Sequence, residues 1–591
     1  MSPLTRIAGR GIIQPSEAGG ARLPNVVGPR VAARLLVPFA LAALALLSAS
    51  CGRDASALSA TPVATGAAAS PVRYGGTLVL ANRGDPPAGF DSLRTSSIAL
   101  HHVGGALFGP GNLVMRCRED ASQVCAYLAA SWSHNTDFTE WSFDIRPGVF
   151  WHDGTPFTAA DAKFWLDLAY FGARAGEKVR APAYFKAELG EIERVEAPGP
   201  DRLRVVFAAP NRHFVESLAN PRFKIAHPRH LMQPRIDAGE VSLSPLDVGL
   251  VGLGPFALEK YEPGTIVQVR RFDRYFETSP EGPLPYLDGI DYVVMTEPLA
   301  MDIAFRSGRL DGGARGQGHY LSPERKQGYV KDLGDDVVFA RIEGGTFRLA
   351  FNVLKTGPWQ DSRIRRAIAL WIDKPAAIPA ALPFGWTSLE TTAGDGEIRR
   401  DFVNWPGFDQ APLESRRAEA TMLMAEAGYA GGFRMGHLCR ALNPAPCEYL
   451  KDQLAGLGID LTLQMLDEAE WNAARLTLDF DSEQGRLTPP SIPEATVSVY
   501  GRYSINPDAF TKHEDASVDA LYARLNDAAS PEERIARWRD IERYLFFEQT
   551  YVIPIAESVD EVAYRSYVRG LAIPMFDGHA NTDFSTVWLA K

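Results

Sequence analysis

The sequence predicts a mixed α/β protein that is divided into at least two lobes. The chain has 591 residues, whereas a single hydrophobic core rarely grows past about 250–300 residues. Short apolar or alternating runs, typical of strands, lie between amphipathic stretches that are typical of helices. The composition, 46% hydrophobic and 23% charged, is that of an ordinary globular protein.

The first fifty residues have the pattern of a secretory signal. Arg30 and Arg34 precede an apolar run over 35–47, which is too short to span a hydrocarbon core of about 30 Å. Small residues then lead directly to Cys51. This pattern resembles the bacterial lipobox, in which the cysteine is acylated, although Ser48 stands where a leucine is usual. We expect removal of 1–50 and a lipid on Cys51; the alternative is plain cleavage that leaves a free thiol.

Residues 51–72 are rich in Ala, Ser, Thr and Pro and have almost no large side chains. Such a segment cannot bury enough apolar surface to order itself, so it predicts a flexible tether. The net charge is −11, and the basic residues of the first fifty make the remainder more acidic still. An acidic body repels phosphate backbones, which argues against a nucleic-acid partner.

Four further cysteines form two pairs with the same spacing, Cys117 with Cys125 and Cys439 with Cys447. No Cys-x-x-Cys occurs, so a zinc knuckle or a thioredoxin-like site has little support. In an oxidising compartment the pattern predicts two local disulfides. Each would close a short loop and contribute about 2.5 kcal/mol. Four reduced core cysteines are the alternative.

Strands are expected over 76–82, an apolar run after two glycines, and over 137–149, where aromatic and aliphatic residues alternate with polar ones. A helix should begin at Thr158, with Asp161 completing a capping box. Its apolar face is expected to consist of Phe164, Trp165, Leu168 and Phe171.

A second helix is predicted from Asp361, because Ile364, Ala367, Ile368, Trp371 and Ile372 recur at helical spacing. The arginines at 363, 365 and 366 are expected mostly on its solvent side. A third helix should begin at Ser530, which is followed by Pro531 and two glutamates, and 551–558 reads as a buried strand.

These segments together resemble one family, the extracellular solute-binding proteins of family 5, which are the oligopeptide, dipeptide and nickel binders of ABC importers. The strongest block has a Leu-Ala-Ala-Ser-Trp start at 128–132, an Arg-Pro-Gly-Val turn at 146–149 and a helix entry from His152 to Asp161. Seven blocks follow the family's order: 128–169, 254–264, 285–295, 303–313, 351–374, 426–433 and 517–554.

The resemblance implies a two-lobe periplasmic-binding-protein fold, α/β in class, with a ligand held between the lobes and a double hinge crossing. The first lobe would cover 73–342, with an extra subdomain at about 100–230. The second lobe would cover 343–554, and 555–591 would return to the first lobe.

Three histidines invite a catalytic or metal-binding interpretation. His152-Asp153 belongs to a turn that feeds a capped helix, so a structural role is favoured over catalysis. His227 and His230 have metal-like spacing, but a proline lies between them. Because no known nucleophile, Walker or zinc-protease motif occurs, we expect no enzyme, no catalytic residues, no metal and no cofactor.

In the peptide-binding members an aspartate of the second lobe pairs with the ligand's ammonium. Matched on Pro507, that place is taken here by Tyr503, so an anionic, aromatic or sugar-like group is expected instead. Asp479 or Asp481 could supply the carboxylate, and the tyrosines could merely pack. The candidate ligand-binding residues are Ser97, Tyr184, Arg348, Trp386, Tyr500, Arg502 and Tyr503.

The sequence therefore predicts a monomeric, exported and lipid-anchored binding protein of the periplasm or cell envelope. It would capture a peptide or peptide-like small solute for an ABC permease and its ATPase subunits. Two alternatives remain open: a secreted hydrolase resembling a metallopeptidase, and a lipoprotein that serves sensing or assembly without transport.

Overall fold

The structure is a computed structural model of the chain. It describes residues 71–591 except 83, 95–96, 120–122, 172–188, 241–242, 313–320, 322, 382–385, 388–410, 442–443, 488–500, 505–508, 510, 572–574, 577–578 and 581–582. The predicted signal, residues 51–70 of the tether, Cys51, Tyr184 and Tyr500 lie outside the described residues.

The first sheet has the strand order β1-β12-β9-β8. The expected strand over 76–82 is β1 (Thr77–Asn82), which runs parallel to β12 (Gly289–Val294), a partner more than two hundred residues later. Antiparallel strands β9 (Ile266–Arg271) and β8 (Phe256–Glu262) complete the sheet. Helix α1 (Ile98–Phe108) packs its Val103 and Leu107 into the core of this sheet.

A second four-stranded sheet lies in the inserted subdomain. Its strands are β4 (Ala129–His134), β5 (Glu140–Ile145), β7 (Arg202–Phe207) and β6 (Ile192–Glu196) in that spatial order. The expected alternation is confirmed, because Trp141, Phe143 and Ile145 of β5 are all buried in one core. Helix α2 (Ala159–Leu166) packs on this core and begins where the sequence predicts.

The predicted capping box of Thr158 and Asp161 is confirmed. The Asp161 carboxylate accepts hydrogen bonds from both the backbone N–H and the hydroxyl of Thr158, at 2.9 and 2.7 Å. Phe171 was expected on the apolar face with Phe164, but 47% of its surface is exposed. A π-helical turn over Asp167–Phe171 follows α2, and its wider turn rotates later side chains away from the α-helical phase.

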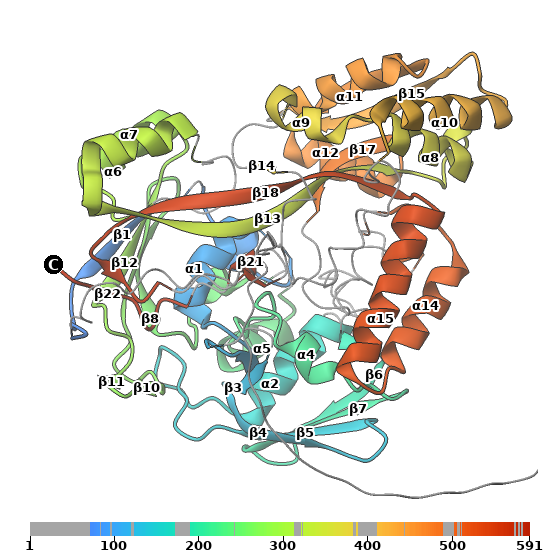
Figure 1. The fold of residues 1–591 in the computed structure, drawn as a ribbon. Coiled ribbons are helices and arrows are strands. Elements are labelled where there is room, and N and C mark those ends of the chain that lie inside the picture. The colour runs from blue at the N-terminus through green and yellow to red at the C-terminus, as the bar shows by residue number, and fades with distance from the viewer. Residues whose placement is uncertain are drawn as a thin grey trace, which may run out of the picture. The chain divides into compact units, whose positions relative to one another are not determined.

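The third sheet has six strands in the order β14-β18-β13-β17-β15-β16. They are β14 (Trp386–Thr387), β18 (Val552–Arg565), β13 (Val337–Phe351), β17 (Ser482–Leu487), β15 (Phe433–Arg440) and β16 (Ile459–Leu466). Helices α8 (Ser362–Trp371), α10 (Leu413–Glu426) and α11 (Ala445–Ala455) share its core and are grouped at one end of it in Figure 1.

The long strands β13 and β18 pair antiparallel and connect two hydrophobic cores (Figure 1). Ile553 and Ile555 of β18 belong to the core that contains α8, whereas Val562 and Tyr564 belong to the core of the first sheet. Gly312 bridges Leu80 of β1 to Tyr564. The result is a two-lobe α/β fold whose lobes share these strands; the lobe boundaries given above remain predictions.

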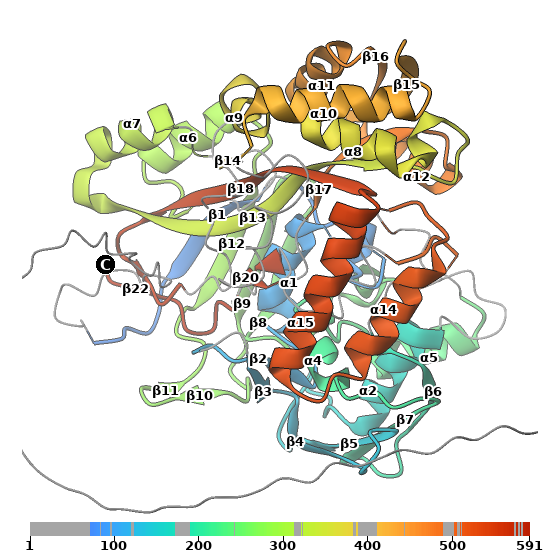
Figure 2. The same ribbon diagram turned by 45° about the vertical axis from the view of Figure 1, so that its right-hand side comes forward.

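Helices α14 (Ala516–Asn526) and α15 (Pro531–Glu542) lie side by side in both views (Figures 1 and 2). The start of α15 is as predicted, since the Ser530 hydroxyl accepts from the Glu533 N–H at 3.1 Å.

The remaining named helices and strands of the described residues are short. They are α4 (Phe214–Leu218), α5 (Arg229–Asp237), α6 (Pro298–Arg306), α7 (Pro323–Leu333), α9 (Lys374–Ala381), α12 (Glu468–Thr477), β2 (Val114–Arg116), β3 (Val124–Ala126), β10 (Thr278–Ser279), β11 (Gly282–Pro283), β19 (Val568–Arg569), β20 (Met575–Phe576), β21 (His579–Ala580) and β22 (Trp588–Leu589). Among the helices that the structure describes, none combines the length and apolarity needed to cross a bilayer.

One arginine of α8 contradicts the sequence expectation. The helix buries Ile364, Ala367 and Ile368 as predicted, but Arg365 is buried as well, with 2% exposure. Its guanidinium donates to the carbonyl oxygens of Gln549 and Trp359 at 2.6 and 2.7 Å. Arg365 therefore joins α8 to the segment before β18, a role that the amphipathic pattern of α8 alone does not show.

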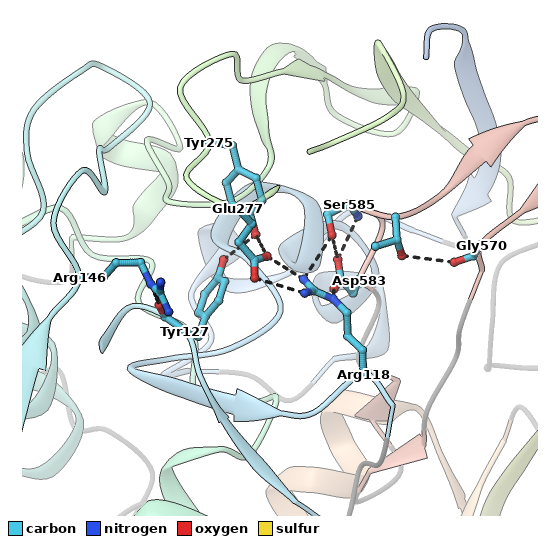
Figure 3. A network of polar contacts seen from close by, with 9 residues as sticks. Arg118, Tyr127, Arg146, Tyr275, Glu277, Gly570, Asp583 and Ser585 are labelled. Carbon is cyan, nitrogen blue, oxygen red and sulfur yellow. Dashed lines mark hydrogen bonds and ion pairs between the residues drawn. The ribbon is translucent and has the colours of Figure 1, made fainter. Parts of the chain in front are cut away.

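The end of the chain is held by a polar network around Arg118 (Figure 3). Arg118 lies in the hairpin loop that Cys117–Cys125 closes, and it donates to Glu277 at 2.7 Å and forms an ion pair with Asp583. Burial would lower the pKa of Arg118, but Asp583 and Glu277 outweigh it and raise that pKa. The hairpin thereby fixes the segment around 583–585 to residues of the first lobe.

Candidate ligand-binding site

The second lobe contains a buried cluster of charges, which we call the charge cluster: Arg348, Arg475, Glu483 and Lys512. Arg348 of β13 donates from Nη2 to Oε1 of Glu483 on β17 at 3.0 Å, and neither side chain is exposed. Arg475 of α12 donates from Nε to the other carboxylate oxygen at 2.7 Å. The antiparallel pairing of β13 with β17 brings Arg348 close to Glu483, and Arg475 approaches from α12.

Lys512 is the fourth member of the charge cluster, and its side chain is 1% exposed. Its backbone forms an isolated β-bridge with Asn352, the residue that follows β13. Burial alone would raise the pKa of Glu483, but the cations Arg475, Arg348 and Lys512 outweigh it and hold that pKa below its usual value. Glu483 is therefore ionised at neutral pH inside the protein.

The charge cluster connects two of the predicted ligand-binding residues. Lys512 Nζ lies 5.4 Å from the ring centroid of Tyr503, within the range of a cation–π contact. Tyr503 is half-buried and donates its backbone N–H to the His513 carbonyl at 2.9 Å. Arg348 and Tyr503 are thus linked through Glu483 and Lys512.

Arg502 has protein partners. Its Nη2 lies 2.6 Å from Oδ2 of Asp519, and its Nη1 lies 3.5 Å from Oε2 of Glu514. The side chain is 27% exposed. An anionic ligand at Arg502 would therefore compete with two carboxylates, which was not apparent from the sequence.

The other predicted residues are placed as follows. Ser97 is the N-cap residue of α1, is half-buried, and its carbonyl accepts from the amides of Leu100 and His101. Trp386 pairs through its backbone with Ser558 of β18; its side chain lies outside what the structure describes.

The alternative anchors Asp479 and Asp481 lie next to Lys355. Asp481 is 3.0 Å from Lys355 Nζ and accepts the Gly436 N–H at 2.7 Å. Asp479 is 83% exposed and 3.5 Å from the same ammonium. Asp481 is thus already bound by a cation and an amide, and the more exposed Asp479 shares that cation.

Sequence reasoning did not identify Glu483, Arg475 or Lys512. Three consecutive polar residues, Ser482, Glu483 and Gln484, are the only weak signal in the sequence. They lie in β17, which pairs with a strand on each side, and a strand inside a sheet buries at least some of its side chains. A buried charge needs an opposite charge, so a carboxylate in such a strand indicates cations nearby.

The histidines support a structural interpretation. His152 Nδ1 accepts the Gly252 N–H at 3.1 Å, and Nε2 donates to the Gly254 carbonyl at 3.0 Å. Burial lowers the pKa of His152 to about 4. His227 is paired with Asp91 at 3.0 Å and His230 with Asp153 at 2.6 Å. Each of these three imidazoles thus has a hydrogen-bond partner within the protein, as a structural role requires.

Comparison with known proteins gives one family. The sequence model described as bacterial extracellular solute-binding proteins, family 5 Middle, matches residues 123–504, which is more than half of the chain. A glutathione-binding protein, GsiB, of Pectobacterium atrosepticum is 25% identical over 348 residues, which cover 58% of this chain and 61% of that protein. A putative ABC transporter peptide-binding protein of Brucella ovis is 27% identical over 254 residues, 42% of this chain and 43% of that one. The match to GsiB spans only about three fifths of that relative's length.

Solved structures share the fold over a longer range. The binding protein AgaA of A. tumefaciens R10, in complex with agropinic acid, has a TM-score of 0.70 at 22% identity, with 87% of this chain and 99% of that chain covered. DppA of Helicobacter pylori, in complex with the peptide STSA, has a TM-score of 0.71 at 17% identity, covering 88% and 99%. The fold and the family match agree, and the chain belongs to the bacterial extracellular solute-binding proteins of family 5.

Proposed function

We propose that the protein is the substrate-binding component of an ABC importer and captures a peptide or peptide-like small solute between its lobes. The observation that carries this proposal is the family match over 123–504. The two-lobe fold, with long strands shared between two cores, supports it because such folds close around ligands by hinge motion. The permease and its ATPase subunits would be the partners, and the protein would act as a monomer.

The ligand we propose has an acidic group. Tyr503 stands where an ammonium-binding aspartate is expected. Lys512 lies 5.4 Å from its ring, and Arg348 belongs to the same charge cluster through Glu483. Arginine, lysine and tyrosine donors suit a carboxylate. Glutathione, agropinic acid and the peptide STSA, with which the related proteins are described, all carry a carboxylate. Ser97, Tyr184, Trp386, Tyr500 and Arg502 remain proposed contributors.

We propose binding without chemistry. A hydrolase that used His152 as a base or metal ligand would first have to break its hydrogen bonds with Gly252 and Gly254. His227 would likewise have to leave the buried Asp91. The family consists of binding proteins, and the proposed site needs no cofactor.

The test is calorimetry of the purified protein against short peptides, opine-like acids and sugars, followed by mass spectrometry of each ligand after incubation. Saturable binding with ligands recovered intact supports the proposal. Cleavage of a peptide that His152→Ala abolishes would favour the hydrolase instead. A separate pull-down from detergent-solubilised host membranes tests the transport role: recovery of a permease with the ligand-loaded protein supports it, and recovery of none would point to the sensing or assembly role.

A further inference from the structure

Three potential metal ligands meet in the second lobe, on the side of β15 that pairs with β17 next to Glu483. His437 and Cys439 lie two residues apart on β15, and Cys447 lies on α11. Alternate residues of a strand face the same side. One nitrogen of His437 and the two sulfurs all lie within 4.8 Å of one another, and all three side chains are fully buried.

The hydrogen bonds of Ser482 indicate which His437 nitrogen carries the proton. The Ser482 hydroxyl donates its single hydrogen to the Gly436 carbonyl at 3.0 Å. The contact of 2.8 Å between Ser482 Oγ and His437 Nδ1 is therefore donated by Nδ1–H. Nε2 then carries a lone pair, and this buried atom has no hydrogen-bond partner within the described part of the chain.

This arrangement is the one that metal-binding histidines adopt, with one nitrogen held by a hydrogen bond and the other left with a lone pair. Two thiolates and one neutral imidazole would exactly balance the charge of Zn²⁺, so the complex could remain buried without a net charge. Gln484 Oε1, 2.7 Å from Cys447 Sγ, supplies a nearby oxygen for a fourth position. In this structure Cys439 and Cys447 form a disulfide, so neither sulfur is a thiolate that could bind a metal ion.

We propose that reduction of Cys439–Cys447 opens a buried two-cysteine, one-histidine site for a thiophilic metal ion such as Zn²⁺. A dithiol transfers two electrons and two protons to the disulfide and becomes a cyclic disulfide, leaving two thiols. Zn²⁺ then replaces the two thiol protons, and His437 Nε2 donates its lone pair. The proposal does not rest on the proposed transport function.

The second disulfide provides a matched control. Cys117–Cys125 spans the same number of residues and is closed in the same way. Among the described residues, no comparable group of three metal-binding side chains forms around it. Reducing it should create two thiols but no site of this kind.

The test uses the full mature chain, reduced with dithiothreitol, desalted without oxygen and titrated with Zn²⁺ against a chromophoric chelator. We expect one tight site in the reduced protein and at least a hundredfold weaker binding in the oxidised protein. The C117S/C125S variant should keep that site, C439S/C447S should lose it, and His437→Gln should weaken it by tenfold or more. Co²⁺ in place of Zn²⁺ should show thiolate-to-metal charge-transfer absorption.

A folding-independent readout uses the wild type alone. Zn²⁺ should protect Cys439 and Cys447, but not Cys117 and Cys125, from alkylation of the reduced protein, as peptide mapping would show. Absence of a tight site in reduced protein with native circular dichroism would overturn the proposal. So would equal alkylation of all four cysteines with and without Zn²⁺.

Discussion

At the scale of single residues, the second lobe depends on Glu483. This carboxylate is fully buried, and Arg348 and Arg475 each donate to one of its oxygens. Such a group stabilises the fold only while it is ionised and paired. Lys512, which helps to hold Glu483 ionised, lies 5.4 Å from the Tyr503 ring, so the charges that stabilise the fold extend to the proposed ligand site.

Replacing Glu483 tests this dependence. Glu483→Gln removes the charge that Arg348 and Arg475 require, and it should lower the free energy of unfolding at pH 7 by about 3–5 kcal/mol. The folded-state pKa of Glu483 is lowered, so its contribution is present above the unfolded-state pKa and is lost as pH falls through the folded one. The difference between wild type and variant should therefore shrink at acidic pH. Urea unfolding of both proteins across pH measures it, with the exposed Glu240→Gln as a control that should change little.

The proposed ligand class rests on the assignment of Tyr503 and Arg502 to the binding site. Tyr503→Asp should raise the affinity for peptides with a free ammonium, because a carboxylate then occupies the place that it holds in peptide binders. Arg502→Ala should weaken the native ligand by about tenfold to a hundredfold, because the ligand's acidic group loses a charged hydrogen-bond donor. Calorimetry measures the ligand affinity of each variant. Arg434→Ala, at an exposed arginine, is the control and should leave that affinity unchanged. Tight dipeptide binding that neither change affects would contradict the assignment.

At the scale of elements, the sequence predicted helices and strands best where a local signal defines them. Capping at Ser530, the alternation in β5 and the apolar run of β1 all have such signals. The exposure of Phe171 follows from a π-helical turn, which depends on packing rather than on local spacing. Arg365 is buried because it donates to Gln549, and Arg348 of the charge cluster pairs with Glu483, both far along the chain. The periodicity of a single helix or strand carries no information about such distant partners.

The hairpin of β2 and β3 holds the segment around 583–585 through Arg118. Non-reducing peptide mapping should find Cys117 linked to Cys125 and Cys439 linked to Cys447. C117S/C125S should cost about 2.5 kcal/mol from loop closure alone, and more if Arg118 also loses Glu277 and Asp583. Arg118→Met in the disulfide-bonded protein separates the two contributions by denaturant unfolding. A pair that joins Cys117 to Cys439 would contradict the lobe assignment.

At the scale of the whole molecule, two lobes share β13 and β18, and the family to which the chain belongs is defined across both. The sequence predicts a lipid anchor at Cys51, ahead of a segment poor in large side chains.

Cys51→Ala tests the attachment. If Cys51 is acylated, the variant should move from the membrane fraction to the soluble exported fraction, whereas Cys117→Ser should not move. Fractionation followed by immunoblotting measures this, and metabolic labelling with a fatty-acid analogue identifies the modified residue. Wild-type protein that is already soluble and carries a free thiol would contradict the lipid anchor.

The central claim is that this protein captures a small solute with an acidic group. Native mass spectrometry of the protein, purified from its host without denaturation, tests it most directly. We predict a retained small molecule at one copy per chain that carries a carboxylate and is lost from Arg348→Ala. Protein that is free of any small molecule, and that binds no acidic peptide or opine-like acid when these are added back, would contradict the account.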